Sequence, residues 1–165
     1  MSPRNRIILA VSTILALVVG IPWFLDMDER RIRKRLQELA DTVSMESNSG
    51  LATTRAAAAF PGFFTPNVIL DTGNEEIDGS HTRDEILSLY MQGRASCNRI
   101  VLHFEEPVFI YSSKGKARLS TVATLTLDPK GEASSRDRRN LTLSWEKQDG
   151  KWLLSKARSR TEKEP

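Results

Sequence analysis

Four stretches of alternating apolar and polar residues lie between residues 99 and 160, and they constrain the fold more than any other feature of the chain. Ile100, Leu102 and Phe104 alternate with polar or smaller residues, and a period of two places them on one face of a strand. Short turn sequences separate the stretches, so we expect an antiparallel sheet. The predicted strands are Arg99–Tyr111, with Pro107 marking a bulge or an edge, Lys116–Asp128, Asp137–Gln148 and Lys151–Arg160.

The dipeptide Asp149-Gly150 predicts the register of the last hairpin. With these two loop residues, Gln148 pairs with Lys151, Lys147 with Trp152, and Trp145 with Leu154. The two tryptophans then share one face of the hairpin, because residues alternate between the faces of a strand. We expect this face to pack against helices.

The residues before this sheet carry helical patterns. A first helix begins at Asp26 or Asp28, either of which is a good N-cap. Its apolar residues recur at helical spacing: Ile32, Leu36, Leu39, Ala40 and Val43. An alanine-rich helix follows over residues 51–60, and the capping box that runs from Thr82 to Glu85 begins a third helix. With a short strand over Val68–Asp71, this pattern predicts one α+β domain over residues 26–160, followed by a polar tail over 161–165.

The N-terminal region contains 19 successive uncharged residues, Ile7–Leu25. As a helix they would extend about 28 Å, close to the thickness of the hydrocarbon core of a bilayer. The alternative is a signal peptide cleaved before Ile21, but no small-residue cleavage site of the A-x-A kind is present. We therefore expect residues 1–25 to be a short tail and a single transmembrane anchor. Arg4, Arg6 and the amino terminus favour an N-terminus inside the cell, although the basic residues after the anchor favour the opposite orientation.

The charge of the chain argues against a nucleic-acid partner. From Asp26 onwards there are 22 basic and 21 acidic residues, which is a balanced surface. Residues 114–160 hold a local excess, 12 basic against 5 acidic, which we interpret as solvated strand faces. The first helix also carries a basic cluster that either contacts anionic lipid headgroups or forms a plain solvated face: Arg30, Arg31, Arg33, Lys34 and Arg35.

The order of these elements resembles the nuclear transport factor 2-like superfamily, also called SnoaL-like or cystatin-like. The resemblance rests on three stretches, Phe63–Gly73, Ile77–Ile86 and the closing Gln148–Leu154, and extends over about residues 27–160. It implies a cone in which a bent antiparallel sheet wraps about three helices around a pocket. This superfamily includes isomerases, dehydratases, ligand binders and assembly modules, so the fold does not determine the function. Anchored cones of this kind occur in bacterial type IV secretion machinery.

Asp71, Tyr90 and His103 are the candidate catalytic residues, with Glu105 and His81 as further polar groups. An isomerase of the ketosteroid type needs a carboxylate base and acidic donors that face an apolar cavity, and a dehydratase of the scytalone type needs histidines and an aspartate. Each candidate also has a structural interpretation: Asp71 caps a turn, Tyr90 belongs to the core, and His103 is solvated if Ile100 and Phe104 face the core.

No motif for a metal or a cofactor is present, because Cys97 and the two histidines lack the spacing of metal ligands. We therefore expect a membrane-anchored binding or assembly module without catalysis, whose partner is another protein or a second copy of the chain. The alternative is an isomerase, dehydratase or ligand-binding protein that uses the cavity of the cone. The expected location is a bacterial inner membrane, with the domain outside the cytoplasm.

Overall fold

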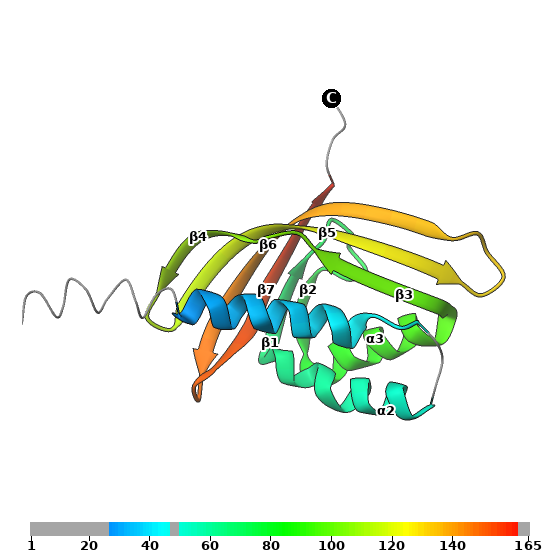
Figure 1. The fold of residues 1–165 in the computed structure, drawn as a ribbon, viewed down its shortest axis with the longest axis horizontal. Helices are drawn as coiled ribbons and strands as arrows, with labels where there is room; N and C mark the ends of the chain where they lie inside the picture. Colours follow the sequence, from blue (N-terminus) through cyan, green and yellow to red (C-terminus); the bar gives the residue numbers. More distant parts are fainter. Residues whose placement is uncertain (1–26, 47–49, 162–165) are drawn as a thin grey trace, which may run out of the picture.

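A computed structural model describes residues 27–46 and 50–161. A bent sheet forms one layer, and three helices cover its concave face (Figure 1). The helices are the one over residues 27–43, α2 (Gly50–Ala59) and α3 (Arg83–Ser96), and the short 3-10 helix η1 (Phe60–Phe63) follows α2. The predicted α+β arrangement is thus confirmed.

The helices form where their sequence signals predict them. On the helix of residues 27–43, Ile32 and Leu36 are fully buried, as the apolar stripe requires. The capping box of α3 is complete: the Thr82 hydroxyl accepts from the backbone N–H of Glu85, and the Glu85 carboxylate accepts from the backbone N–H of Thr82. These local bonds fix the start of α3 at the end of β2.

The sheet has the strand order β2-β1-β7-β6-β5-β3, and β4 also pairs with β5. Its strands are β1 (Phe64–Asp71), β2 (Gly79–Thr82), β3 (Cys97–Phe104), β4 (Val108–Ser113), β5 (Lys116–Pro129), β6 (Ser135–Gln148) and β7 (Lys151–Thr161). The prediction of an antiparallel sheet is wrong in one place, since β1 and β7 are parallel and the sheet is mixed. Alternation within a strand indicates which face is buried but carries no information about the direction of a distant partner.

The predicted strand over 99–111 is divided at Pro107. Its two halves, β3 and β4, pair with different parts of β5 along the same edge. Proline has no N–H for the ladder, which accounts for the break. Beyond it, β4 exposes Val108, Ile110 and Tyr111 to solvent.

The last hairpin has the predicted register. Gln148 pairs with Lys151, Lys147 with Trp152, and Trp145 with Leu154. The turn residues Asp149 and Gly150 both have positive φ, 49° and 77°, as a two-residue hairpin turn requires. Beyond Leu154 the register shifts, so that Ser155 is an extra residue on β7.

One main core lies between the helices and the sheet. It contains Trp145 and Trp152, exposed by only 1% and 2%, with apolar side chains from the helix of residues 27–43, η1, β1 and α3. Within the described residues, no helix is long and apolar enough to cross a membrane. The anchor predicted over residues 7–25 lies outside the described part of the chain, as do residues 162–165 of the predicted tail.

Candidate functional site

Asp71 lies at the end of β1, on the outer, convex face of the sheet. Its Oδ2 accepts a hydrogen bond of 2.6 Å from Nε of Arg158 on β7, and both side chains are 43% exposed. The carboxylate is thus engaged by a guanidinium at the surface of the protein. Asp71 therefore acts as a surface ion-pair partner and does not face the interior.

Tyr90 is on the inner side, where it joins α3 to the end of the helix of residues 27–43. Its ring stacks on Phe60 at 4.1 Å, and its hydroxyl donates to the carbonyl oxygen of Thr42 at 2.8 Å. The same hydroxyl accepts from Nη1 of the buried Arg94 at 2.5 Å. Burial raises the pKa of Tyr90, although the bond from Arg94 opposes this effect. The hydroxyl and Nη1 of Arg94, at 3.5 Å, thus both donate to a carbonyl at the end of a helix.

The two histidines and Glu105 are either exposed to solvent or engaged in local contacts. His103 is exposed on the outer face of β3, because Ile100 and Phe104 pack on the core side as the alternation predicted. Nε2 of His81 lies 2.6 Å from the carbonyl oxygen of Ile77, beside the capping box of α3. Glu105 forms an ion pair of 2.9 Å with Arg138.

Asp71, Tyr90 and His103 therefore lie in three separate places and do not form a catalytic group. Metal binding has no better basis: among residues 27–46 and 50–161, no three His, Cys, Asp or Glu side chains come together in a group that could hold a metal ion. Among the described residues, Nε1 of Trp145 and Nε of Arg94 are two of the buried side-chain atoms that have no hydrogen-bond partner.

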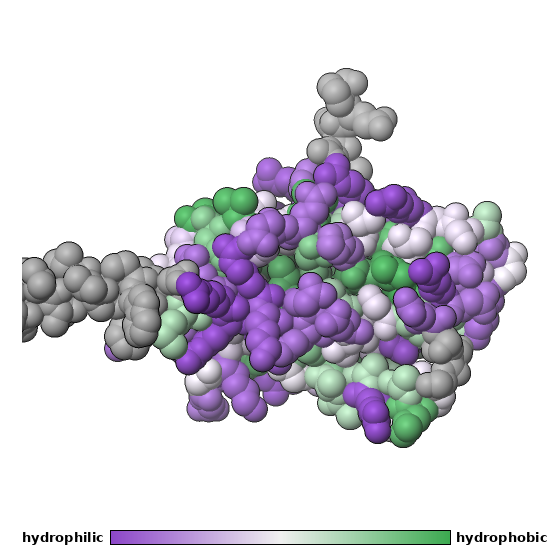
Figure 2. Space-filling model, viewed as in Figure 1, coloured by the Kyte–Doolittle hydropathy of each residue, from purple (hydrophilic) through white to green (hydrophobic). Residues whose placement is uncertain are grey.

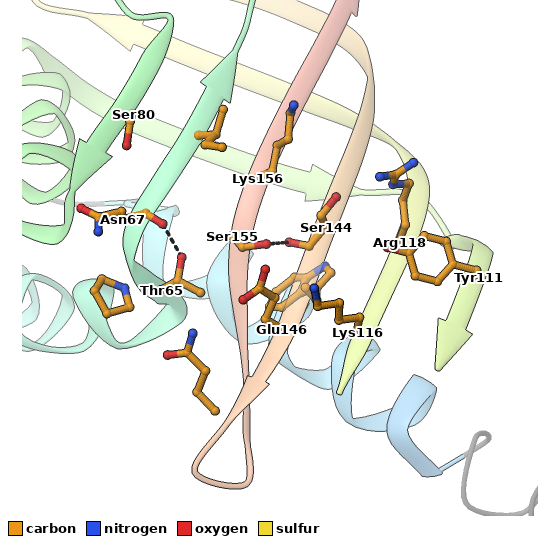
Figure 3. Close-up of a pocket in the computed structure, with 14 residues that line it drawn as sticks. Thr65, Asn67, Ser80, Tyr111, Lys116, Arg118, Ser144, Glu146, Ser155 and Lys156 are labelled. Atoms are coloured by element: carbon orange, nitrogen blue, oxygen red, sulfur yellow. Dashed lines mark hydrogen bonds between the residues drawn. The ribbon is translucent and has the colours of Figure 1, made fainter. Parts of the chain in front are cut away.

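The outer face of the sheet is hollowed into a cleft of about 520 Å³ (Figure 3). Its floor is made by small residues, where the Ser155 hydroxyl donates to the carbonyl oxygen of Ser144 at 3.2 Å. One wall comes from β1 and β2, with Asn67, Ile69 and Ser80, and the other comes from the β4–β5 hairpin. The extra residue at Ser155 bends β7 here, so the sheet itself forms the hollow.

Cations predominate around this cleft. Lys116, Arg118 and Lys156 line it, with Glu146 as the carboxylate among the lining residues. The guanidinium of Arg118 lies 5.4 Å from the centre of the Tyr111 ring, which holds it at the rim. A smaller hollow beside it adds Arg158, which is already paired with Asp71. The cleft is therefore suited to a partner that carries negative charge.

Sequence reasoning did not identify this cleft as a site. Its signal was the basic excess over residues 114–160, which we interpreted as solvated strand faces. Lys116 and Arg118 lie two residues apart on β5, as do Lys156 and Arg158 on β7, so each pair shares one face of its strand. The two strands flank β6, and the excess falls on the outer side of the sheet. A count of charge by face, instead of by segment, would have indicated it.

No protein-family model matches the sequence, and no curated protein matches it. Solved structures share the fold. A nuclear transport factor 2-like protein with a cystatin-like fold from Novosphingobium aromaticivorans is 8% identical, with 89% of this chain and 90% of that one covered at a TM-score of 0.65. A provisionally assigned scytalone dehydratase from the same species is 12% identical, with 82% and 84% covered at a TM-score of 0.69. A type 2 hexachlorocyclohexane dehydrochlorinase is 14% identical, with 82% and 86% covered at a TM-score of 0.64.

These likenesses extend over most of each chain, and they show that the described part has the nuclear transport factor 2-like cone fold. At such low sequence identity the likeness shows the fold and not the activity, since this architecture supports many unrelated activities. The function has to be argued from the surface and the interior of this chain.

Proposed function

We propose that the chain is a binding or assembly module, held at a membrane by residues 7–25, and that it does not catalyse a reaction. One observation carries the proposal. The polar candidates for catalysis are separate and already engaged or solvated, while Trp145, Trp152 and their neighbours occupy the space between the helices and the sheet. An enzyme needs polar groups that converge on a cavity, and a module that binds through its surface does not.

The outer cleft is the binding surface in this proposal. Its rim is basic, and exposed apolar side chains adjoin it, with Ile69 at 45% and Tyr111 at 41% exposure. Hydrophobic residues also gather at the upper left of Figure 2, over β4. Apolar contact supplies affinity and complementary charge supplies specificity. The partner is thus a protein surface with carboxylates beside apolar side chains, on another protein or on a second copy of the chain.

Photo-crosslinking in cells tests this surface in the full chain. A crosslinking amino acid in place of Ile69 or Tyr111 is expected to give a discrete higher-mass product. The charge reversals Arg118→Glu and Lys156→Glu together are expected to abolish it, because they repel an acidic partner. Arg99→Glu, an exposed cation on β3, serves as the control and is expected to leave the product unchanged. An equal yield from all three chains would refute the proposal for this face.

Membrane attachment is tested separately, by washing membranes with alkaline carbonate. An anchored chain stays in the pellet. A released chain that begins near Ile21 would show that a signal peptide had been cleaved instead.

A second function, binding or conversion of a small molecule inside the cone, is favoured by the unpartnered Nε1 of Trp145. A ligand with a hydrogen-bond acceptor would satisfy this N–H. Thermal unfolding of the full chain with a panel of aromatic ketones tests the idea. A rise in Tm that disappears in Trp145→Phe would support this function, and no rise across the panel would count against it.

A further inference from the structure

The distance between the predicted anchor and the domain is very short. Only Asp26 separates Leu25, the last residue of the anchor, from Met27, where the described helix begins. Two residues of chain extend at most about 7 Å. If residues 7–25 span the bilayer, as the proposed function states, the start of this helix therefore lies at the headgroup layer.

Contacts bring two turns of the sheet to the same end of the domain. Oδ1 of Asp28 accepts from Nζ of Lys147 at 3.0 Å and from Nε1 of Trp152 at 3.2 Å, so the β6–β7 turn adjoins the start of the helix. The backbone N–H of Lys147 donates to the carbonyl oxygen of Gly115 at 2.9 Å, which places the β4–β5 turn beside it. We call this region the helix-start end: residues 27–34, 113–116 and 148–151 (left in Figure 1).

Exposed cations predominate at the helix-start end. Lys34 is 79% exposed and Arg31 is 54% exposed, and with Lys151 they line a cleft of about 660 Å³ between the helix, η1 and the β6–β7 turn. The cations of this end are Arg30, Arg31, Arg33, Lys34, Lys114, Lys116 and Lys151, and Lys147 adjoins it. The carboxylates are Asp28, which holds Lys147, with Glu29 and Asp149.

The basic cluster of the helix is not uniform. Arg33 forms an ion pair with Glu106 and lies over the Phe109 ring, 5.2 Å from its centre. Arg35 donates to the carbonyl oxygen of Gly62 at 2.6 Å and lies over the ring of Phe63. These two arginines contact protein groups. Arg31 and Lys34 have more distant carboxylate neighbours, Asp28 and Glu38, each at 3.9 Å, and their side chains are 54% and 79% exposed. The cations directed to solvent therefore come from the helix and the two turns together.

We propose that the helix-start end lies flat on the bilayer and contacts the phosphates of anionic phospholipid headgroups through Arg31, Lys34, Lys114 and Lys151. This inference depends on the proposed anchoring and deepens it, because it orients the domain. Each Lys or Arg near an anionic leaflet raises the ratio of docked to undocked domain about fivefold. The outer cleft then extends away from the membrane along the sheet and remains accessible to a partner.

The experiment uses the full chain in vesicles of phosphatidylcholine with phosphatidylglycerol, and in phosphatidylcholine alone. A fluorophore is attached to a single cysteine that replaces Ser113, in a Cys97→Ala background, and its quenching by headgroup-labelled lipid is measured. A second reporter replaces Ala133, in the β5–β6 turn at the opposite end of β5, roughly 36 Å away at 3.3 Å per residue.

We expect quenching at residue 113 to exceed quenching at residue 133 severalfold, and to fall in uncharged vesicles. The pair Lys114→Glu and Lys151→Glu is expected to lower the ratio of docked to undocked domain at least about 30-fold. The pair Lys130→Glu and Arg136→Glu, at the far end, is the matched control and is expected to have no effect. If the chain stays in the membrane pellet after alkaline carbonate but both reporters are quenched equally, the orientation is wrong and the anchoring still holds. Release of the chain by carbonate would overturn the anchoring, and the inference with it.

Discussion

Replacing Trp152 by Ala tests the core face of the last hairpin. The indole is 2% exposed and belongs to the main core together with Trp145. Its Nε1 donates to Asp28, and Nζ of Lys147 lies 5.7 Å from the ring centre. The substitution removes buried aromatic volume and one hydrogen bond to a carboxylate, while the ion pair between Asp28 and Lys147 can persist.

We expect Trp152→Ala to lower the free energy of unfolding by about 3–5 kcal/mol, as for other buried large aromatic residues. That is a large fraction of the total stability of a domain, about 5–15 kcal/mol. Trp152→Phe keeps most of the ring and loses the N–H, so its expected cost is about 1–2 kcal/mol. The difference between the two variants separates packing from hydrogen bonding.

Urea unfolding of the full chain in detergent micelles, followed by circular dichroism, measures both variants. The midpoint is expected to fall while the slope with urea stays the same, because the surface exposed on unfolding changes little. A loss below about 1 kcal/mol for Trp152→Ala would mean that this face of the hairpin is not a core face. The agreement between the predicted register and the observed pairs would then be coincidental.

The further predictions concern polar contacts of Asp78, Tyr90 and Thr82. The backbone N–H of Thr72 donates to the carboxylate of Asp78 and lowers its pKa below 3.8, so this bond stabilises the fold above that pH and ceases to do so as the pH falls through the folded pKa. Asp78→Asn is therefore expected to flatten the acid limb of a plot of unfolding free energy against pH. An unchanged slope would contradict this. Tyr90→Phe is expected to cost about 1–3 kcal/mol in urea unfolding, because the buried Arg94 loses a partner. Burial raises the pKa of Tyr90, so wild-type stability is expected to fall as the pH rises above 10.0, and this fall should be absent in Tyr90→Phe. Thr82→Ala is expected to lower Tm through a loss of about 1 kcal/mol, with Thr82→Ser restoring it.

Local signals in the sequence predicted much of this fold. The capping box at Thr82 and the turn at Asp149-Gly150 each act within a few residues, so their consequences are visible in a short window. Pro107 indicated an irregularity in the same way, but not that it divides the strand in two. The apolar stripe through Ile32 and Leu36 is likewise visible in a short window of the sequence. The order and faces of the elements follow from such signals.

Long-range pairing was not predictable in this way. Phe64 pairs with Leu154 and Asp71 with Arg158, and no periodic pattern relates residues so far apart. Asp71 faces outwards because Val68 and Leu70 of the same strand pack on the core side, but its ion-pair partner Arg158 follows only from the pairing of β1 with β7. Both the parallel pairing and the outer cleft therefore required the structure.

The position of β7 has a consequence for how the domain is made. In the sheet, β1 and β2 are joined to β6, β5, β3 and β4 through β7, which is the last strand of the domain in the sequence. During synthesis every other strand leaves the ribosome before the one that links them, and at about 5–20 residues per second the chain waits seconds for it. Throughout that interval β1 and the outer edge of β6 are open ladders that can pair wrongly. Until β7 has emerged, the two parts of this sheet therefore remain unconnected.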